Sequence, residues 1–458
     1  MKHFFKKLNA SGIAALDSTM TKPSIIYGKN DNQIRIFDSN DGFCIKLKYN
    51  GDDYEHIFSA KSYALDDENL IAAIRYETSE NRGFYKFSLS NLENPVRLYK
   101  KKLDETNKVY NYALMGAIGI DNNGINTALS FPYVTTTDGN MNDPYYTGII
   151  QSINQTPSNV WRTIDTSKKD VQILGINGER LHPHSKLYVY DGYTYFAAYD
   201  YGIEGVENNR AFRYAYICRT NDMVNFQTKP ILDVTTNGGS ISSITDAKLQ
   251  ITEPDMVIRE DGKAYFVIRC GGDYSNFTDL DKRNAGYFYG EINNVSTYFN
   301  AIDDYPLYDS QDIDGDFSNT RVYIKYVDCN EITVGGHLKG VIPQIFLHNG
   351  ESRVILYSRC IYVNGVSYAH NQIYYLPSPT NIAERYKIGK SHNSHSSHNS
   401  PQGGNMGVSV FGNYLSILCP HDRTRELCCF FIPLQSLDDA NFLETLVDIE
   451  NNSTQIEL

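Results

Sequence analysis

The chain has 458 residues with 54 acidic and 42 basic side chains, which gives a formal net charge of −12. This balance argues against a broadly basic nucleic-acid-binding surface. The 36 tyrosines and 21 phenylalanines, against a single tryptophan (Trp161), favour pleated, half-buried surfaces. The composition therefore indicates a β-rich globular protein.

The sequence contains no apolar run of the roughly 20 residues that a membrane helix needs, so we expect no membrane insertion. Residues 1–16 have a basic start but only broken apolar stretches, which argues against a cleaved secretory signal. The eight cysteines include no Cys-x-x-Cys pair. We expect them to be reduced, buried thiols in a chain that folds in a reducing cytosol.

A β-hairpin recurs along the chain, built from an apolar strand, a turn of Asp, Asn or Gly, and a second apolar or aromatic strand. Weak copies turn near Asp66–Asn69 and Asp121–Gly124, and the segment near Asn30–Asn32 is a further candidate. The clear copies span 187–199, 256–269, 345–357 and 408–418, with turns at Asp191-Gly192, Asp261-Gly262, Asn349-Gly350 and Gly412-Asn413. Helical periodicity is confined to a short stretch around 436–447.

The irregular spacing of these turns does not suit a solenoid, and it predicts an all-β fold, a β-propeller with five or six blades and loop insertions. A two-sheet sandwich or a mixed β assembly is the alternative. We expect residues 1–20 to form a short N-terminal attachment segment or stem and residues 21–440 to form the propeller. Inserted loops are expected at about 300–320 and 388–404, and residues 441–458 are expected to form a C-terminal tail.

Two of these loops contain residue types that bind metals. One contains three histidines at three-residue spacing, and the other contains aspartates at alternate positions, which are weak candidates for a calcium site. We expect polar surface loops, with no cofactor and calcium as the weak alternative. The residues are His392, His395 and His398, and Asp312, Asp314 and Asp316.

Several inner hairpins begin with a residue–proline step, as in His182-Pro183 and Glu253-Pro254. Proline costs no ladder hydrogen bond at the first residue of a strand and fixes the entry direction. The first strand of a hairpin begins, and the second ends, on the same edge, so polar residues at both places should converge on one propeller face. The predicted polar mouth contains His182, His184, Asp200, Glu253, Asp255, Arg269, Gln344 and Arg359, with Arg75 at the matching position of an earlier hairpin. The alternative is that these residues cap strand ends locally.

The run 253–269 resembles the blade signature of sialidases and furanosidase-type glycosidases. Residues 220–226, Thr-Asn-Asp-Met-Val-Asn-Phe, are similar to the Ser-x-Asp-Leu-x-Asn-Trp stretch between blades of the latter. The resemblance implies glycoside hydrolysis by two carboxyl groups, with Glu253 as general acid and Asp200 or Asp255 as its partner. It also implies that Arg269 and Arg359, with Arg75 in a sialidase, clamp the substrate. Only one carboxylate stands at the start of an inner strand, so the catalytic set is incomplete.

In architecture and composition the chain is similar to receptor-binding proteins of staphylococcal phages. That resemblance implies a tail or baseplate protein of the virion, a homotrimer that binds other tail proteins and a cell-surface polysaccharide such as teichoic acid. Three functions stay open: this receptor-binding protein, a cytoplasmic or exported glycosidase, and a structural propeller that docks other proteins. Two carboxylates that face one another across the mouth would favour the glycosidase. A deep mouth without such a pair would favour the receptor-binding protein, and a plugged mouth would favour the structural propeller.

Overall fold

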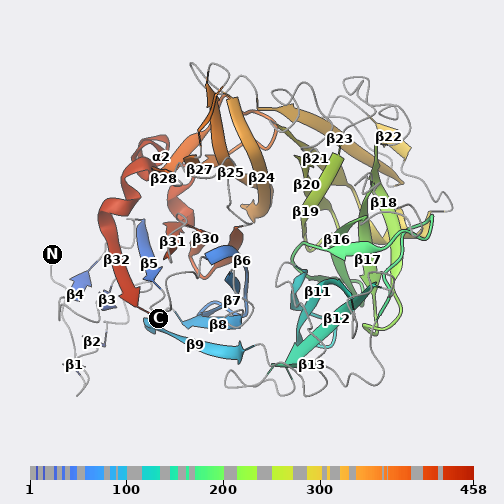
Figure 1. Ribbon diagram of the computed structural model, residues 1–458, viewed down its shortest axis with the longest axis horizontal. Coiled ribbons are helices and arrows are strands. Elements are labelled where there is room, and N and C mark those ends of the chain that lie inside the picture. Colours follow the sequence, from blue (N-terminus) through green and yellow to red (C-terminus); the bar gives the residue numbers. More distant parts are fainter. Residues whose placement is uncertain are drawn as a thin grey trace.

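The computed structural model shows a ring of β-sheets around a central axis (Figure 1). It describes the following residues, and all structural statements refer to them: 7–8, 14–15, 25–27, 34–36, 42–48, 57–76, 83–88, 91–100, 116–134, 145–152, 161–163, 171–200, 214–234, 250–271, 286–301, 307–309, 320–329, 337–363, 366–368, 370–393, 406–420 and 426–457. The two termini of the described chain lie on the same side of the ring (Figure 1).

The first three blades follow one another along the chain. The first contains β6 (Ile57–Ala64), β7 (Asn69–Tyr76), β8 (Gly83–Ser88) and β9 (Asn91–Lys100). The second contains β10 (Ile118–Ile120), β11 (Asn126–Val134), β12 (Tyr145–Ser152) and β13 (Trp161–Thr163). The third contains β14 (Leu181–Pro183), β15 (Tyr188–Tyr190), β16 (Tyr193–Asp200), β17 (Tyr214–Thr220) and β18 (Gln227–Asp233).

Two further blades and a mixed blade complete the ring. The fourth contains β19 (Gln250–Ile258), β20 (Ala264–Gly271), β21 (Gly286–Ile292), β22 (Leu307–Asp309) and β23 (Arg321–Asp328), with helix α1 (Val295–Asn300) after β21. The fifth contains β24 (His337–His348), β25 (Glu351–Val363), β26 (Val366–Tyr368), β27 (His370–Leu376) and β28 (Tyr386–Asn393). The last contains β29 (Gly407–Phe411), β30 (Tyr414–Pro420), β31 (Glu426–Pro433), β5 (Phe43–Lys48) and β32 (Ser453–Glu457).

The last blade joins both ends of the described chain. Strand β5 pairs antiparallel with β31 and parallel with β32, so strands from opposite ends of the sequence complete one sheet. Residues 441–458 were expected to form a tail, but most of them contribute to helix α2 (Ala440–Thr445), the 3-10 helix Leu446–Asn452 and β32. Two short pairs, β1 (Lys7–Leu8) with β2 (Ala14–Ala15) and β3 (Ile25–Tyr27) with β4 (Ile34–Ile36), lie outside the blades.

The inner hairpins form where the sequence predicts them, because their turn residues adopt backbone angles that few residues tolerate. Asp191 and Gly192 have φ of 49° and 77°, and Asn349 and Gly350 have φ of 52° and 78°. Such paired positive angles match the twist of the flanking strands and suit Asp-Gly and Asn-Gly. The predicted all-β propeller is confirmed, and six sheets of four or five strands make up the ring.

The hydrophobic core lies mainly between neighbouring blades. One cluster joins the last blade to the first: Phe43 and Phe431 of the last blade stack with ring centroids 5.0 Å apart, and Leu70 of the first blade belongs to the same cluster. Another joins the third blade to the fourth around Tyr195, Phe266 and Phe288. Seven cysteines, all buried and free, are part of this interior. No helix among the described residues has the length and apolar character needed to cross a membrane.

Candidate functional site

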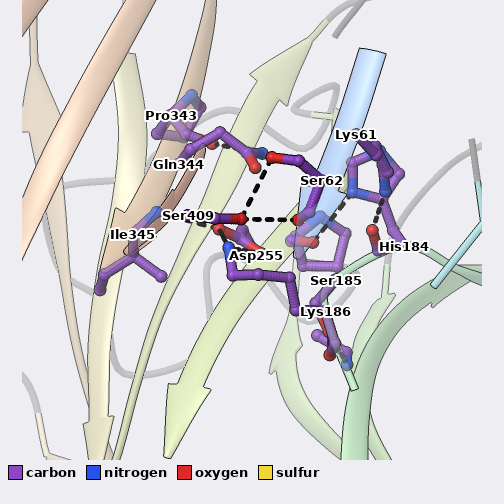
Figure 2. Close-up of polar contacts among 12 residues, drawn as sticks. Lys61, Ser62, His184, Ser185, Lys186, Asp255, Pro343, Gln344, Ile345 and Ser409 are labelled. Carbon is purple, nitrogen blue, oxygen red and sulfur yellow. Dashed lines mark hydrogen bonds and ion pairs between the residues drawn. The ribbon is translucent and has the colours of Figure 1, made fainter. Parts of the chain in front are cut away.

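The first strands of the blades lie next to one another around the axis, in the order β6, β10, β14 with β15, β19, β24 and β29. Midway along them, side chains from all six blades meet around a void of about 10 Å³, room for about one water molecule. We call this the axial layer; it contains Lys61, Ser62, Ile118, His184, Ser185, Lys186, Asp255, Gln344, Gly407 and Val408. Figure 2 shows polar side chains of this layer, such as Lys61, Ser62 and Asp255, extending from different strands toward one another, and only the small void is left between the residues of the layer.

Lys61 is the charged group of β6 in the axial layer, and it is buried. Its ammonium donates a hydrogen bond to the backbone carbonyl of His184 in the third blade. Burial lowers the pKa of Lys61 to about 7, although Asp255 and Glu253 raise it, and Lys186 lowers it further. The lysine is thus poised between its charged and neutral forms near neutral pH.

His184 links the third blade to the fourth. Its Nδ1 lies 3.0 Å from the backbone carbonyl oxygen of Pro254. Burial, and then the neighbouring Lys61, hold the pKa of His184 well below its usual value, so the ring is neutral at physiological pH. A carbonyl can only accept a hydrogen bond, so Nδ1 carries the proton and donates it to Pro254. The ring thereby holds the backbone carbonyl directly after Glu253.

Asp255 links the fourth blade to both of its neighbours. Its carboxylate accepts a hydrogen bond from the backbone N–H of Ile345 at 2.9 Å and pairs with the Lys186 ammonium at 3.1 Å. The Asp255 side chain is 2% exposed and that of Lys186 is 12% exposed. These two donors satisfy the buried carboxylate, so Asp255 connects the third, fourth and fifth blades.

Glu253 lies at an interruption of the ladder between β19 and β20, because the register shifts between Thr252 and Asp255. Its φ of 51° is in the left-handed region, which is uncommon for a residue with a side chain. Bulges of this kind redirect side chains and are frequent beside active sites. The Glu253 carboxylate pairs with the guanidinium of Arg269 on β20, and each side chain is 12% exposed. An arginine beside a carboxylate favours the ionised carboxylate.

The other predicted members of the third blade lie next to one another at the mouth end of β14 and β16. The His182 ring lies 5.0 Å from the Tyr199 ring, centroid to centroid, and the His184 ring lies 6.0 Å from the same tyrosine. Asp200 is buried and accepts a hydrogen bond from the backbone N–H of Tyr214 at 3.0 Å. Asp200 therefore helps to fix the start of β17.

Gln344 is buried in the axial layer and donates from Nε2 to the Pro343 carbonyl at 3.1 Å. Arg75 pairs with Ser59 in the ladder of β6 and β7. Arg359 follows Ser358 in β25, which pairs with Val341 of β24. The side chains of both arginines lie outside the described residues, so a three-arginine cluster stays a prediction.

The residues that resemble an inter-blade glycosidase motif form the turn between β17 and β18. Asp222 accepts hydrogen bonds from the backbone N–H groups of Val224 and Asn225 at 2.8 and 2.7 Å. Desolvation raises the pKa of Asp222, but these bonds and those from the Asn225 and Thr220 side chains outweigh it and lower the pKa to about 2. The motif thus serves turn formation at the edge of a blade.

The candidate calcium residues Asp312, Asp314 and Asp316 lie outside the described residues, as do His395 and His398. His392 is in β28, where its backbone pairs with Asn371. Within the described part of the chain, no group of three His, Cys, Asp or Glu side chains is arranged to hold a metal ion.

Sequence reasoning missed the two lysines of the axial layer, Lys61 and Lys186. Lys61 belongs to a hairpin whose weak turn, near Asp66–Asn69, was recognised, but its strand has no residue–proline step. A charged residue in the middle of an inner strand was the available signal. Lys186 lies in the short interruption between β14 and β15, directly before the hairpin expected at 187–199.

No protein-family model and no curated protein matches the sequence. Among solved structures, the α-L-arabinofuranosidase of Fusarium graminearum in complex with arabinobiose is similar, with 10% identity and a TM-score of 0.51 over 86% of this chain and 99% of that chain. The two proteins share the β-propeller fold. An α-L-arabinanase of Penicillium chrysogenum has 10% identity and a TM-score of 0.49, over 86% of this chain and 98% of that chain. The Hadza microbial sialidase Hz136 has 9% identity and a TM-score of 0.46, over 88% of this chain and 70% of that chain.

Proposed function

We propose that the protein is a glycoside hydrolase that cleaves a surface or storage glycan at the mouth of the propeller. The observation that carries the proposal is the Glu253–Arg269 pair, in which a carboxylate is set on a left-handed bulge at the mouth side of the axial layer. Support comes from the fold shared with an enzyme named an arabinofuranosidase and solved with arabinobiose.

The ion pair favours a different role for Glu253 from the one that the sequence suggested. A general acid must hold a proton before the reaction, whereas an arginine stabilises the charged form. Glu253 therefore suits the base or the nucleophile of a two-carboxyl mechanism. In this role the carboxylate activates water or attacks the anomeric carbon, and a second carboxyl group protonates the departing oxygen.

The same geometry gives a second candidate, a propeller that binds a glycan without cleaving it, as a phage receptor-binding protein does. Both carboxylates expected to assist Glu253 have structural partners: Asp255 binds Lys186 and the Ile345 N–H, and Asp200 binds the Tyr214 N–H. An anionic polymer such as teichoic acid would then be held by the arginines of the mouth. The virion location and the trimer stay proposals that belong to this candidate.

The two candidates differ in whether sugar is released. The purified protein would be incubated with aryl α-L-arabinofuranoside, aryl sialoside, arabinan and Gram-positive cell walls with and without teichoic acid. Release of sugar from any of them supports hydrolysis, and the glycosidic linkage that is cleaved identifies the substrate class. Retention on walls that vanishes with teichoic acid, without release, supports receptor binding.

A variant of the mouth arginine checks that either result comes from this site. Arg269→Gln leaves Glu253 without its ion pair and should reduce release or retention at least tenfold. Arg259→Gln is the matched control, because Arg259 lies in a hairpin turn and pairs there with Asp261. Equal loss in both variants, or in neither, would contradict a site at the mouth.

A further inference from the structure

The face of the propeller opposite the mouth contains a cavity on the axis. This is the hairpin face, where the first strand of each blade turns into the second. The cavity has a volume of about 470 Å³, within the range of roughly 300–1,000 Å³ that small-molecule sites occupy. Every blade contributes an apolar residue near the end of its first strand: Ala64, Ile120, Leu187, Val257, Leu347 and Val410.

Three of the four polar side chains of the cavity wall are already bonded within the protein, and the fourth is Tyr188. The Tyr63 hydroxyl donates to Asn126 Oδ1 at 2.8 Å, and Lys186 pairs with Asp255 at 3.1 Å. Ser409 Oγ donates to the Ser62 carbonyl at 2.8 Å. An occupant gains most by burying apolar surface here, because it would have to break these bonds to make polar ones.

The axial layer forms the closed inner end of this cavity, since Lys186 lines both the layer and the cavity and Ser409 bonds to Ser62 of the layer. The outer rim is open to solvent at Val189, which is 51% exposed. An occupant therefore enters from the hairpin face and does not pass from the mouth.

The turns around the rim are acidic. Exposed carboxylates lie on the turns of four blades, at Asp66, Asp67, Glu68, Asp191, Glu260, Asp261 and Glu351. The cations beside these turns are already in ion pairs: Arg259 with Asp261 at 2.9 Å, Lys263 with Glu291 at 2.7 Å and Arg353 with Glu351 at 3.0 Å. The rim therefore has a negative potential that reaches about one Debye length, roughly 8–10 Å.

We propose that this cavity binds a small organic cation with an apolar body. The body fills the cavity between the six inner strands, and the cationic head stays at the rim among the turn carboxylates. This arrangement buries apolar surface without removing the charge from water, which would be costly. A matched anion would place its head against the same carboxylates and bind more weakly.

Calorimetric titration with decyltrimethylammonium and with decanoate, both below their micellar concentrations, tests the proposal on the full chain. We expect one cation bound per chain, with the anion at least tenfold weaker. Added salt should narrow that difference because it screens the rim. Equal binding of the two ions would overturn the proposal, as would binding of many cations per chain.

Two variants tie the binding to the cavity. Leu347→Trp fills the cavity and should abolish binding, whereas Val224→Trp is a control, because Val224 is 58% exposed in the turn between β17 and β18. The double substitution Asp66→Asn with Asp191→Asn removes two of the seven rim carboxylates, so it should weaken the preference for the cation while leaving the fold intact, as a thermal unfolding curve would show. Unchanged cation binding in both the filled and the neutralised variants would overturn the proposal.

Discussion

The two halves of the central channel are built from the same six strands but have opposite chemistry. Towards the mouth the strands carry Lys61, His184 and Asp255, whose bonds cross from blade to blade. They also carry Glu253, which pairs with Arg269 of its own blade. Towards the hairpin face they carry aliphatic and aromatic residues around a cavity of about 470 Å³. The polar half is filled and fixed, while the apolar half is hollow. A propeller can thus fix the side chains at one end of its axis by bonds between blades and leave an apolar cavity at the other end.

The largest expected effect is on the polar half. Asp255→Asn removes the charge that faces Lys186 and leaves a buried ammonium without its partner. Loss of one member of a buried pair costs about 3–5 kcal/mol. Chemical denaturation should show a fall of this size in the free energy of unfolding, against less than about 0.5 kcal/mol for Asp191→Asn in an exposed turn. A small change for Asp255→Asn would mean that the blades are held together elsewhere.

The second prediction concerns Lys61, whose pKa is lowered by burial to about 7. Between pH 7 and its ordinary value of 10.5 the unfolded chain binds a proton that the folded chain does not, so this group makes stability rise with pH. The slope approaches about 1.4 kcal/mol per pH unit. Lys61→Met should remove it.

The measurement for Lys61 is the free energy of unfolding at pH 7 and 9 in the wild type and in two variants. Lys325→Met is the control, because Lys325 lies exposed on β23. The wild type and the control should gain more stability than Lys61→Met over this interval. Equal gains in all three would show that Lys61 keeps its proton in the folded chain.

A smaller effect is expected at His184, whose pKa burial and Lys61 hold well below the usual 6.5. The folded chain takes up this proton less readily than the unfolded chain, so stability falls as the pH drops below about 6.5. The substitution His184→Asn keeps a donor for the Pro254 carbonyl. It should reduce the fall in the free energy of unfolding between pH 6.5 and 5 by about 1 kcal/mol. A loss as steep in His184→Asn as in the wild type would contradict this assignment.

The smallest effect is expected where the two halves meet. Ser409 Oγ donates to the Ser62 carbonyl at 2.8 Å and lies 3.1 Å from Ser62 Oγ. Ser409→Ala should lower the free energy of unfolding by about 1 kcal/mol, the usual worth of one buried hydrogen bond. An unchanged free energy would show that water replaces the hydroxyl, which a crystal structure of the variant would reveal.

The sequence was most informative where structure is local. Asp191-Gly192 and Asn349-Gly350 encode their turns in two residues, and the residue–proline steps led to His184, Asp255 and Gln344 on the axis. Contacts between distant blades left no such signal. Lys61 meets His184 across 123 positions, and β5 joins β31 from the other end of the chain. The bulge at Glu253 was also not predicted, because neither a register shift nor the contacts of this segment with Arg269 and His184 can be read from a strand pattern.

In the proposed hydrolysis Glu253 at the mouth carries the reaction, and the decisive measurement is the kcat/KM of Glu253→Gln on the glycan that the wild type cleaves. We predict a fall of about 10²- to 10⁴-fold, the usual worth of a positioned base or acid. Because the substitution leaves the buried Arg269 without its ion pair, the thermal unfolding midpoint should fall as well, so the variant is assayed at a temperature at which its unfolding curve shows it folded. The matched variant Glu260→Gln, in an exposed hairpin turn, should retain wild-type kcat/KM. Full activity in Glu253→Gln would contradict the claim and place the chemistry elsewhere on the propeller.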